Sequence, residues 1–164
     1  MLEALQNTAF SQWLLVSEWG YPILLTLHSL GLAMLVGTIV IIDLRVLGVA
    51  RSIPLLPIKR LMTIVWTAFA VNATSGTMLF AADAVKFAHS PTFQLKLSSI
   101  VIGTVLAALM SKSVLDHSSS FEAAEAGGTA RTRLQSPAVA KSLAALSIVI
   151  WIAAIGLGRY MAYE

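Results

Sequence analysis

The chain has 164 residues, of which 57% are hydrophobic and only 12% are charged, and its formal net charge is +3. Soluble domains carry about 25% charged residues, so this composition excludes an ordinary water-soluble domain and predicts an integral membrane protein. Cysteine is absent, which excludes disulfides, thiolate metal sites and thiol catalysis.

Residues 1–19 are the first predicted element, a short amphipathic helix lying in the membrane interface. Apolar residues recur there at three- and four-residue steps, at Leu2, Leu5, Ala9, Trp13 and Val16. Tryptophan is enriched at headgroup depth, which suits Trp13. The segment has no basic n-region and no small-x-small site, so the first span is expected to remain as an anchor.

Four stretches are long and apolar enough to cross a bilayer as helices, at about 21–42, 61–82, 93–110 and 139–157. They predict an all-α four-helix transmembrane bundle that occupies residues 20–161. Gly20 and Pro22 allow a bend into the first span. Ser90 and Pro91 are typical of an N-cap and first-turn proline at the start of the third.

The basic residues indicate how the bundle is oriented. Eight of the eleven lie in two connections, residues 43–60 and 111–141: Arg45, Arg51, Lys59, Arg60, Lys112, Arg131, Arg133 and Lys141. The positive-inside rule places these connections in the cytoplasm, and both termini and the 83–92 connection on the other side. In a bacterium this is an inner-membrane protein with periplasmic termini. The loop 113–137, rich in Ser, Ala and Gly, is expected to be mobile or partly helical.

Small residues within the spans predict close helix packing, which membrane helices need because lipid gives them no hydrophobic reason to associate. The third span offers Ser98, Ser99 and Gly103 for such contacts. The first two spans offer Ala33, Gly37, Asn72, Ser75 and Gly76. Asn72 is expected to find a hydrogen-bond partner on another helix.

Two ionisable residues lie clearly within the predicted spans, His28 and Lys96. Such residues are costly in hydrocarbon and are candidate functional groups. His28 is about six residues into the first span, roughly 9 Å at 1.5 Å per residue. Lys96 enters the third span from the same side to a similar depth, and His89 lies just before that span. The three groups are therefore expected to converge at one end of the bundle.

This convergence suits haem b, because imidazole nitrogens ligate haem iron and helical bundles build such sites from facing side chains. His28 is the expected axial ligand, His89 a second iron ligand, and Lys96 a partner for propionates or a quinone. Gly76 would leave room for the macrocycle. The alternatives stay open: His28 in an interhelical hydrogen bond, Lys96 reaching back to the interface, and His89 as a plain loop residue.

Asp43, Leu44 and Arg45 close the first span. We expect Asp43 to be an interface anchor, with a contact to Lys59 or Arg60 as the alternative.

Several motifs carry a family resemblance over about residues 10–110. They are Trp19-Gly20-Tyr21-Pro22, His28 with Gly31 and Gly37, Asp43-Leu44-Arg45-Val46-Leu47-Gly48, Gly76, Leu79-Phe80 and Phe93-x-x-Lys96. The chain resembles a family of small four-span bacterial inner-membrane proteins that has no settled activity. More distantly it is similar to copper-resistance D-type domains and to the haem-binding membrane protoporphyrinogen oxidase family. The last likeness implies haem on His28 with Lys96 near its carboxylates.

The sequence thus leads to two hypotheses. The first is a haem-b-carrying inner-membrane protein that acts in electron transfer. Its candidate partners are membrane lipids, other membrane subunits or further copies of the chain, and a quinone. Nucleic acid is not an expected partner. The second is a cofactor-free accessory subunit that packs against a larger membrane complex. Neither requires the chain to be an enzyme by itself.

Overall fold

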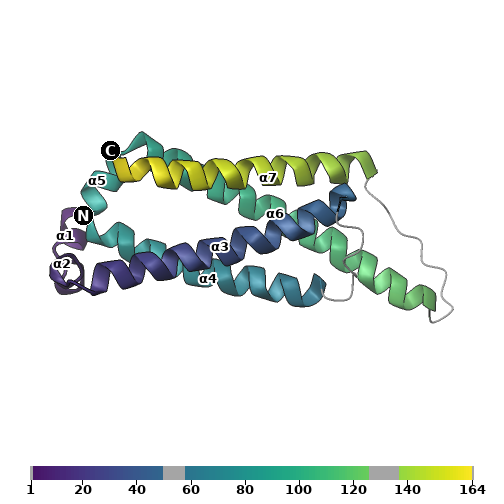
Figure 1. Cartoon of the computed structure of the whole chain (residues 1–164), viewed down its shortest axis with the longest axis horizontal. Coiled ribbons are helices and arrows are strands. Elements are labelled where there is room, and N and C mark those ends of the chain that lie inside the picture. Colours follow the sequence, from purple (N-terminus) through teal and green to yellow (C-terminus); the bar gives the residue numbers. More distant parts are fainter. Residues whose placement is uncertain (1, 50–57, 126–136, 164) are drawn as a thin grey trace.

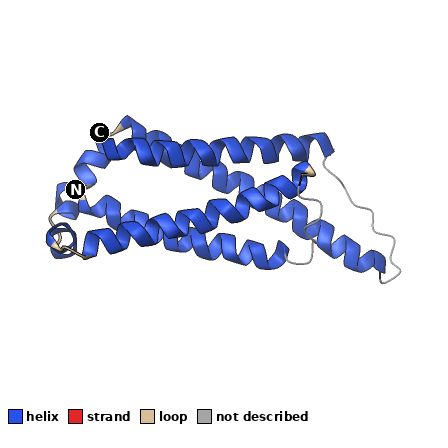
Figure 2. Cartoon of the chain, viewed as in Figure 1, coloured by secondary structure: helices blue, strands red, loops and turns tan. Residues whose placement is uncertain are grey.

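The computed structural model describes residues 2–49, 58–125 and 137–163. Within these ranges the chain is all-helical and contains no strand, as predicted (Figure 2). Four helices are long and apolar enough to cross a membrane. The all-α class and the four candidate spans are therefore confirmed. Arg51, Arg131 and Arg133, three of the basic residues that carry the topology prediction, lie outside the described residues.

The four long helices are α3 (Gly20–Leu47), α4 (Ile58–Ala82), α6 (Pro91–Glu125) and α7 (Pro137–Tyr160). Three of them begin or end close to the predicted limits. The exception is α6, which continues past residue 110 to Glu125 and so includes the first half of the segment expected as a mobile or partly helical loop. Residues 126–136 of that segment lie outside the described residues.

The ends of α3 and α6 follow local sequence signals. α3 ends at Gly48, whose φ of 86° is the left-handed conformation that glycine adopts without strain. The Gly48 N–H bonds to Arg45 O and the Val49 N–H to Leu44 O, which satisfies terminal carbonyls of the helix. At the start of α6, the Phe93 N–H donates to Ser90 Oγ at 3.2 Å, so the N-cap predicted at Ser90 is present.

The N-terminal segment forms two short helices, α1 (Leu2–Gln6) and α2 (Ala9–Val16), in place of one. Thr8 separates them and caps α2, because its Oγ1 accepts the Ser11 N–H at 3.3 Å. α2 packs on the bundle through Leu14, which is 2% exposed, whereas Trp13 of the predicted stripe is 59% exposed. The predicted apolar stripe therefore faces away from the protein core.

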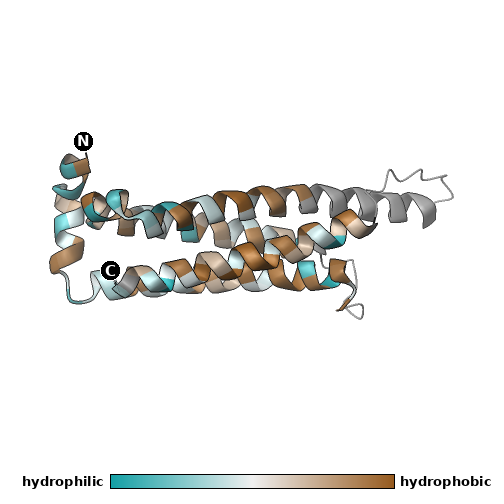
Figure 3. Cartoon of the chain, turned by 90° about the horizontal axis from the view of Figure 1, so that it is seen from above, coloured by the Kyte–Doolittle hydropathy of each residue, from teal (hydrophilic) through white to brown (hydrophobic). Residues whose placement is uncertain are grey.

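The long helices form two antiparallel pairs, α3 with α4 and α6 with α7, and the pairs meet where α3 packs on α7. Both termini lie at one end of the bundle, together with α1, α2, α5 (Ala84–His89) and a 3₁₀ turn at Met161–Tyr163 (Figure 1). We call this the terminal end. Figure 3 shows hydrophobic residues predominating along the middle of the long helices.

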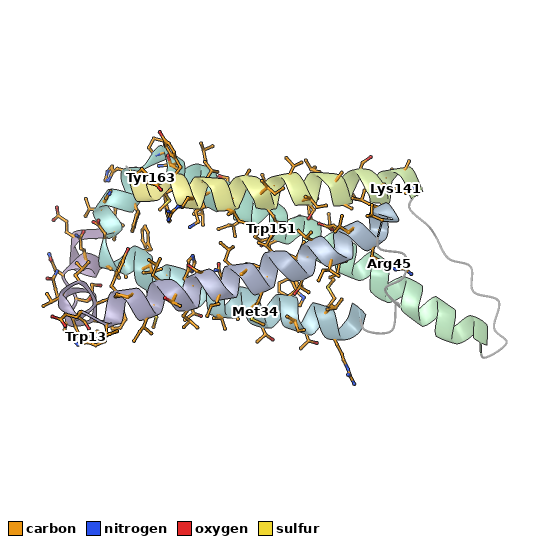
Figure 4. The ribbon with its side chains drawn as sticks, in the orientation of Figure 1. Trp13, Met34, Arg45, Lys141, Trp151 and Tyr163 are labelled. Carbon is orange, nitrogen blue, oxygen red and sulfur yellow. The ribbon has the colours of Figure 1, made fainter. Side chains whose placement is uncertain are left out.

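The apolar core lies in the half of the bundle away from the terminal end. It contains residues of all four long helices: Leu35, Val36, Ile39, Ile42, Met62, Val65, Ala68, Ala107, Trp151 and Ala154. Trp151 projects from α7 toward the other helices and is 1% exposed (Figure 4). Because His28 lies about two to four turns before the α3 residues of this core, the predicted site is located outside it.

Close helix contacts occur at some of the predicted small residues and not at others. A Cβ added to Gly103 would lie 2.9 Å from Trp151 Cε2, so glycine there allows α6 to approach the indole. The prediction for Ala33 and Gly37 was wrong, since Ala33 is exposed and a Cβ on Gly37 would meet nothing within 4 Å. Gly31 makes the contact instead, since a Cβ added there would lie 3.3 Å from the Asn72 backbone nitrogen.

Candidate functional site

His28 lies at the junction of α3 and α4 and is partly buried. Its Nδ1 is 3.1 Å from the Asn72 carbonyl oxygen and 3.1 Å from Ser75 Oγ. In the other direction, Asn72 Nδ2 donates to the His28 carbonyl oxygen at 2.9 Å. The partner predicted for Asn72 is thus the backbone of α3, and two polar side chains join the helices where hydrocarbon would leave them unpaired.

These contacts determine the tautomer of a neutral His28. A backbone carbonyl only accepts hydrogen bonds, so Nδ1 must carry the proton in order to bond Asn72 O. Ser75 Oγ donates to the Val71 carbonyl at 2.7 Å, which leaves its lone pairs to accept from the same Nδ1–H. Nε2 then carries a lone pair. An Nδ1–H held by a carbonyl, with Nε2 available, is the arrangement in which histidine commonly ligates a metal.

Gly76 provides the surface against which the imidazole packs. A Cβ at this position would lie 3.0 Å from His28 Cε1 and 3.4 Å from Nδ1. Glycine therefore makes room for the histidine ring itself. Gly76 was expected to leave space for a macrocycle. In the structure that space is taken by the imidazole, which Gly76 admits and orients.

Lys96 approaches the site from the other helix pair. Its aliphatic stem and ammonium group lie along α7, with Nζ 3.2 Å from where a Cβ of Gly158 would be. Lys96 is near enough to His28 for its charge to reach the imidazole. Gly158 belongs to the last turn of α7, where the unpaired carbonyls at the end of a helix attract a cation.

His89 does not join this pair. It lies on α5, is exposed, and its Nδ1 is 2.8 Å from the Val85 carbonyl of the same helix. None of its contacts in the described part of the chain is to His28 or Lys96. No group of three or more metal-ligating His, Cys, Asp or Glu residues occurs among the described residues. Both predicted iron ligands have Nδ1 beside a backbone carbonyl, but His28 is partly buried between α3 and α4, whereas His89 is exposed on α5.

His28 is thus the residue that would hold a haem iron, and no contact among the described residues brings a second histidine to it. One small cavity lies between the two helix pairs, lined by Leu35, Val65, Thr104 and Trp151 among others. Its volume of about 10 Å³ is close to the minimum for one water molecule, and its lining is apolar. It belongs to the core and is separate from the His28 region.

Asp43 is a functional candidate whose position differs from the prediction. It is 1% exposed, so it is no interface anchor, and it lies beside the Ser147 hydroxyl of α7. Arg60, one expected partner, is exposed, and the side chain of Lys59, the other, lies outside the described residues. The sequence offered one signal that was not used: Ser147 is a polar residue well inside the fourth span.

Comparisons with protein-family models, with curated proteins and with solved structures give no match to this chain.

Proposed function

We propose that this chain is a haem-b-binding protein of the bacterial inner membrane that acts in electron transfer, with His28 Nε2 as the axial ligand. The observation that supports this most is the hydrogen bonding of His28. Its Nδ1 is held by the Asn72 carbonyl at 3.1 Å, which orients the ring and leaves the Nε2 lone pair available. A carbonyl that accepts a hydrogen bond from the other ring nitrogen, here Nδ1, also raises the basicity of a ligating imidazole.

Haem b, when bound, supplies one-electron redox chemistry. The chain's own residues would orient and neutralise it. Gly76 and Ser75 fix the plane of the imidazole, and the Lys96 ammonium supplies a positive charge for a propionate or for a quinone oxygen. Since Lys96 lies close enough to act on His28, both groups can serve one ligand.

The proposed orientation has both termini in the periplasm and the basic connections in the cytoplasm. Two labelled residues in Figure 4 support it: Arg45 and Lys141 lie at the end opposite the termini, as the positive-inside rule requires of cytoplasmic basic residues. Trp13 and Tyr163 lie at the terminal end and are 59% and 73% exposed. Aromatic residues at that level suit a membrane interface, with α1 and α2 lying in its plane.

Absorbance spectroscopy of the detergent-purified protein, oxidised and then reduced, tests the proposal. We expect a Soret band and reduced-state bands of haem b, lost in His28→Ala and retained in the matched control His89→Ala. A wild-type protein with no Soret band after expression with added haem precursor contradicts the haem assignment. A band that persists in His28→Ala contradicts the ligand assignment.

A cofactor-free accessory subunit is the second candidate function, and one feature favours it. α2 exposes several large apolar side chains: Phe10, Trp13, Leu15 and Val16. A partner subunit of a membrane complex would cover such a surface, and His28 would then serve only to join α3 to α4. Co-purification with a stoichiometric membrane partner, without a chromophore, would establish this role.

A further inference from the structure

The second buried polar region lies between α3 and α7, toward the end opposite the termini. Asp43 is 1% exposed and Ser147 is 0% exposed. The carboxyl group of Asp43 and the hydroxyl of Ser147 are neighbours. Even so, Asp43 Oδ2 and Ser147 Oγ are both buried without a hydrogen-bond partner in the described part of the chain. Buried polar atoms of native proteins are rarely unpaired, so two adjacent ones require a physical explanation.

We propose that Asp43 and Ser147 form a proton-binding site within the bundle, in which Asp43 carries an exchangeable proton as a carboxylic acid. A neutral carboxyl group has an O–H donor as well as acceptor capacity, so it can donate to Ser147 Oγ or accept the Ser147 O–H, because a serine hydroxyl does both. It also removes a negative charge from a position with almost no contact with water, where an unpaired carboxylate is costly. The proposal is independent of haem binding at His28.

The surroundings of the pair favour a proton over a metal cation. Ile42 precedes Asp43 and is 3% exposed, and Ala144, one turn from Ser147 on α7, is 0% exposed. These apolar neighbours provide no oxygen ligands, whereas a hard cation typically takes six or more. The described residues contain no group of three metal-ligating acidic, histidine or cysteine side chains at all.

Charged residues of the neighbouring helices are the candidate counter-ions for Asp43. On α4, Arg60 is exposed, and on α7, Lys141 is exposed. On α3 itself, Arg45 follows Asp43 by two residues, a spacing at which helical side chains do not face each other. The side chain of Lys112 on α6 lies outside the described residues. Burial and Ser147 are thus the influences on the carboxyl group that the described residues provide.

Labelling with dicyclohexylcarbodiimide, a hydrophobic reagent that adds to protonated carboxyl groups, tests the site in the full-length protein in detergent. We expect mass spectrometry to find the adduct on Asp43, decreasing as the pH is raised from about 5 to about 9. Asp83 is the internal control, because this partly exposed carboxylate at the terminal end bonds to Gln6 and is not expected to react.

Two labelling results would overturn the proposal. If Asp43 is not labelled, or is labelled equally at every pH, it does not carry an exchangeable proton. Labelling that sodium chloride suppresses, relative to an equal concentration of choline chloride, assigns the site to a cation instead.

A stability measurement provides a second readout. Asp43→Asn is isosteric with the neutral acid, so its Tm should match wild type at low pH and exceed it increasingly as the pH rises. The sign follows from the buried site: a proton favoured in the folded state stabilises the fold at low pH, and that stability is lost when the proton leaves. A Tm difference that is the same at every pH contradicts the proposal.

Discussion

His28 and Asn72 exchange two hydrogen bonds across the α3–α4 contact, and each bond runs from a side chain to the other residue's backbone. His28 Nδ1 lies 3.1 Å from Asn72 O, and Asn72 Nδ2 lies 2.9 Å from His28 O. Truncating one side chain therefore leaves the acceptor of the other bond in place. We therefore expect the two bonds to be energetically separable even though the residues are neighbours.

The first prediction is that a double-mutant cycle will show this separability. Asn72→Ala should cost about 0.6 kcal/mol, and at most about 1.7 kcal/mol, the range for interhelical bonds in membranes. His28→Ala and Asn72→Ala should combine additively to within about 0.5 kcal/mol. Unfolding in mixed detergent–denaturant measures all three variants.

The matched comparison is the cycle of His28→Ala with Ser75→Ala. Here the two side chains touch directly, with Nδ1 3.1 Å from Ser75 Oγ, so a coupling above about 0.5 kcal/mol is expected. Equal coupling in the two cycles would mean that the hydrogen-bond directions assigned here are wrong.

The second prediction concerns Gly76→Ala. The new methyl group would lie 3.0 Å from His28 Cε1, and the imidazole cannot move aside without stretching its bonds to α4. We expect a loss of about 1 kcal/mol of unfolding free energy, typical of overpacking. Thermal unfolding in detergent is the measurement.

In the His28→Ala background the same Gly76→Ala substitution should cost almost nothing, because the ring that it meets is gone. If the cost of Gly76→Ala is unchanged in that background, the glycine is required for a reason other than the imidazole.

The third prediction contrasts two glycines in the long apolar helices, Gly103 in α6 and Gly37 in α3. In Gly103→Ala the Cβ would be 2.9 Å from Trp151 Cε2, and the indole is 1% exposed, with a cavity of only about 10 Å³ beside it. The expected loss is about 1–3 kcal/mol. Gly37→Ala is the control, since its Cβ would meet nothing within 4 Å and alanine favours the helix. A Tm for Gly37→Ala as low as that of Gly103→Ala would exclude the packing explanation.

The fourth prediction is that Thr8→Ala loosens α2 alone. Thr8 Oγ1 caps this helix through the Ser11 N–H, and loss of a cap costs about 1 kcal/mol. Hydrogen exchange should become faster for residues 9–16. Exchange in α3 and α4 and the Tm of the bundle should not change, so a general loss of protection would show that α2 is required for the bundle itself.

Sequence patterns were sufficient for the four apolar helices because a membrane span depends on local composition and length. The N-cap at Ser90 and the end of α3 near Gly48 are local in the same way. They depend on one residue's side chain or backbone freedom; the N-cap appears where it was predicted, whereas α3, expected to close at Asp43 to Arg45, continues to Leu47. The similar depths of His28 and Lys96 in the first and third spans also predicted that the two residues lie near each other, which the influence of the Lys96 charge on His28 supports.

Which face of each helix meets a neighbour was decided only by the tertiary structure. Small residues occur on more than one face of α3, and the relative rotation of α3 and α4 selects Gly31 for contact and leaves Gly37 exposed. The same rotation turns the His28 ring onto Gly76. It is the packing of α3 on α7 that buries Asp43 beside Ser147, 104 residues further along the chain (147 − 43). Such a contact has no local signal, because it depends on how complete helices pack against one another.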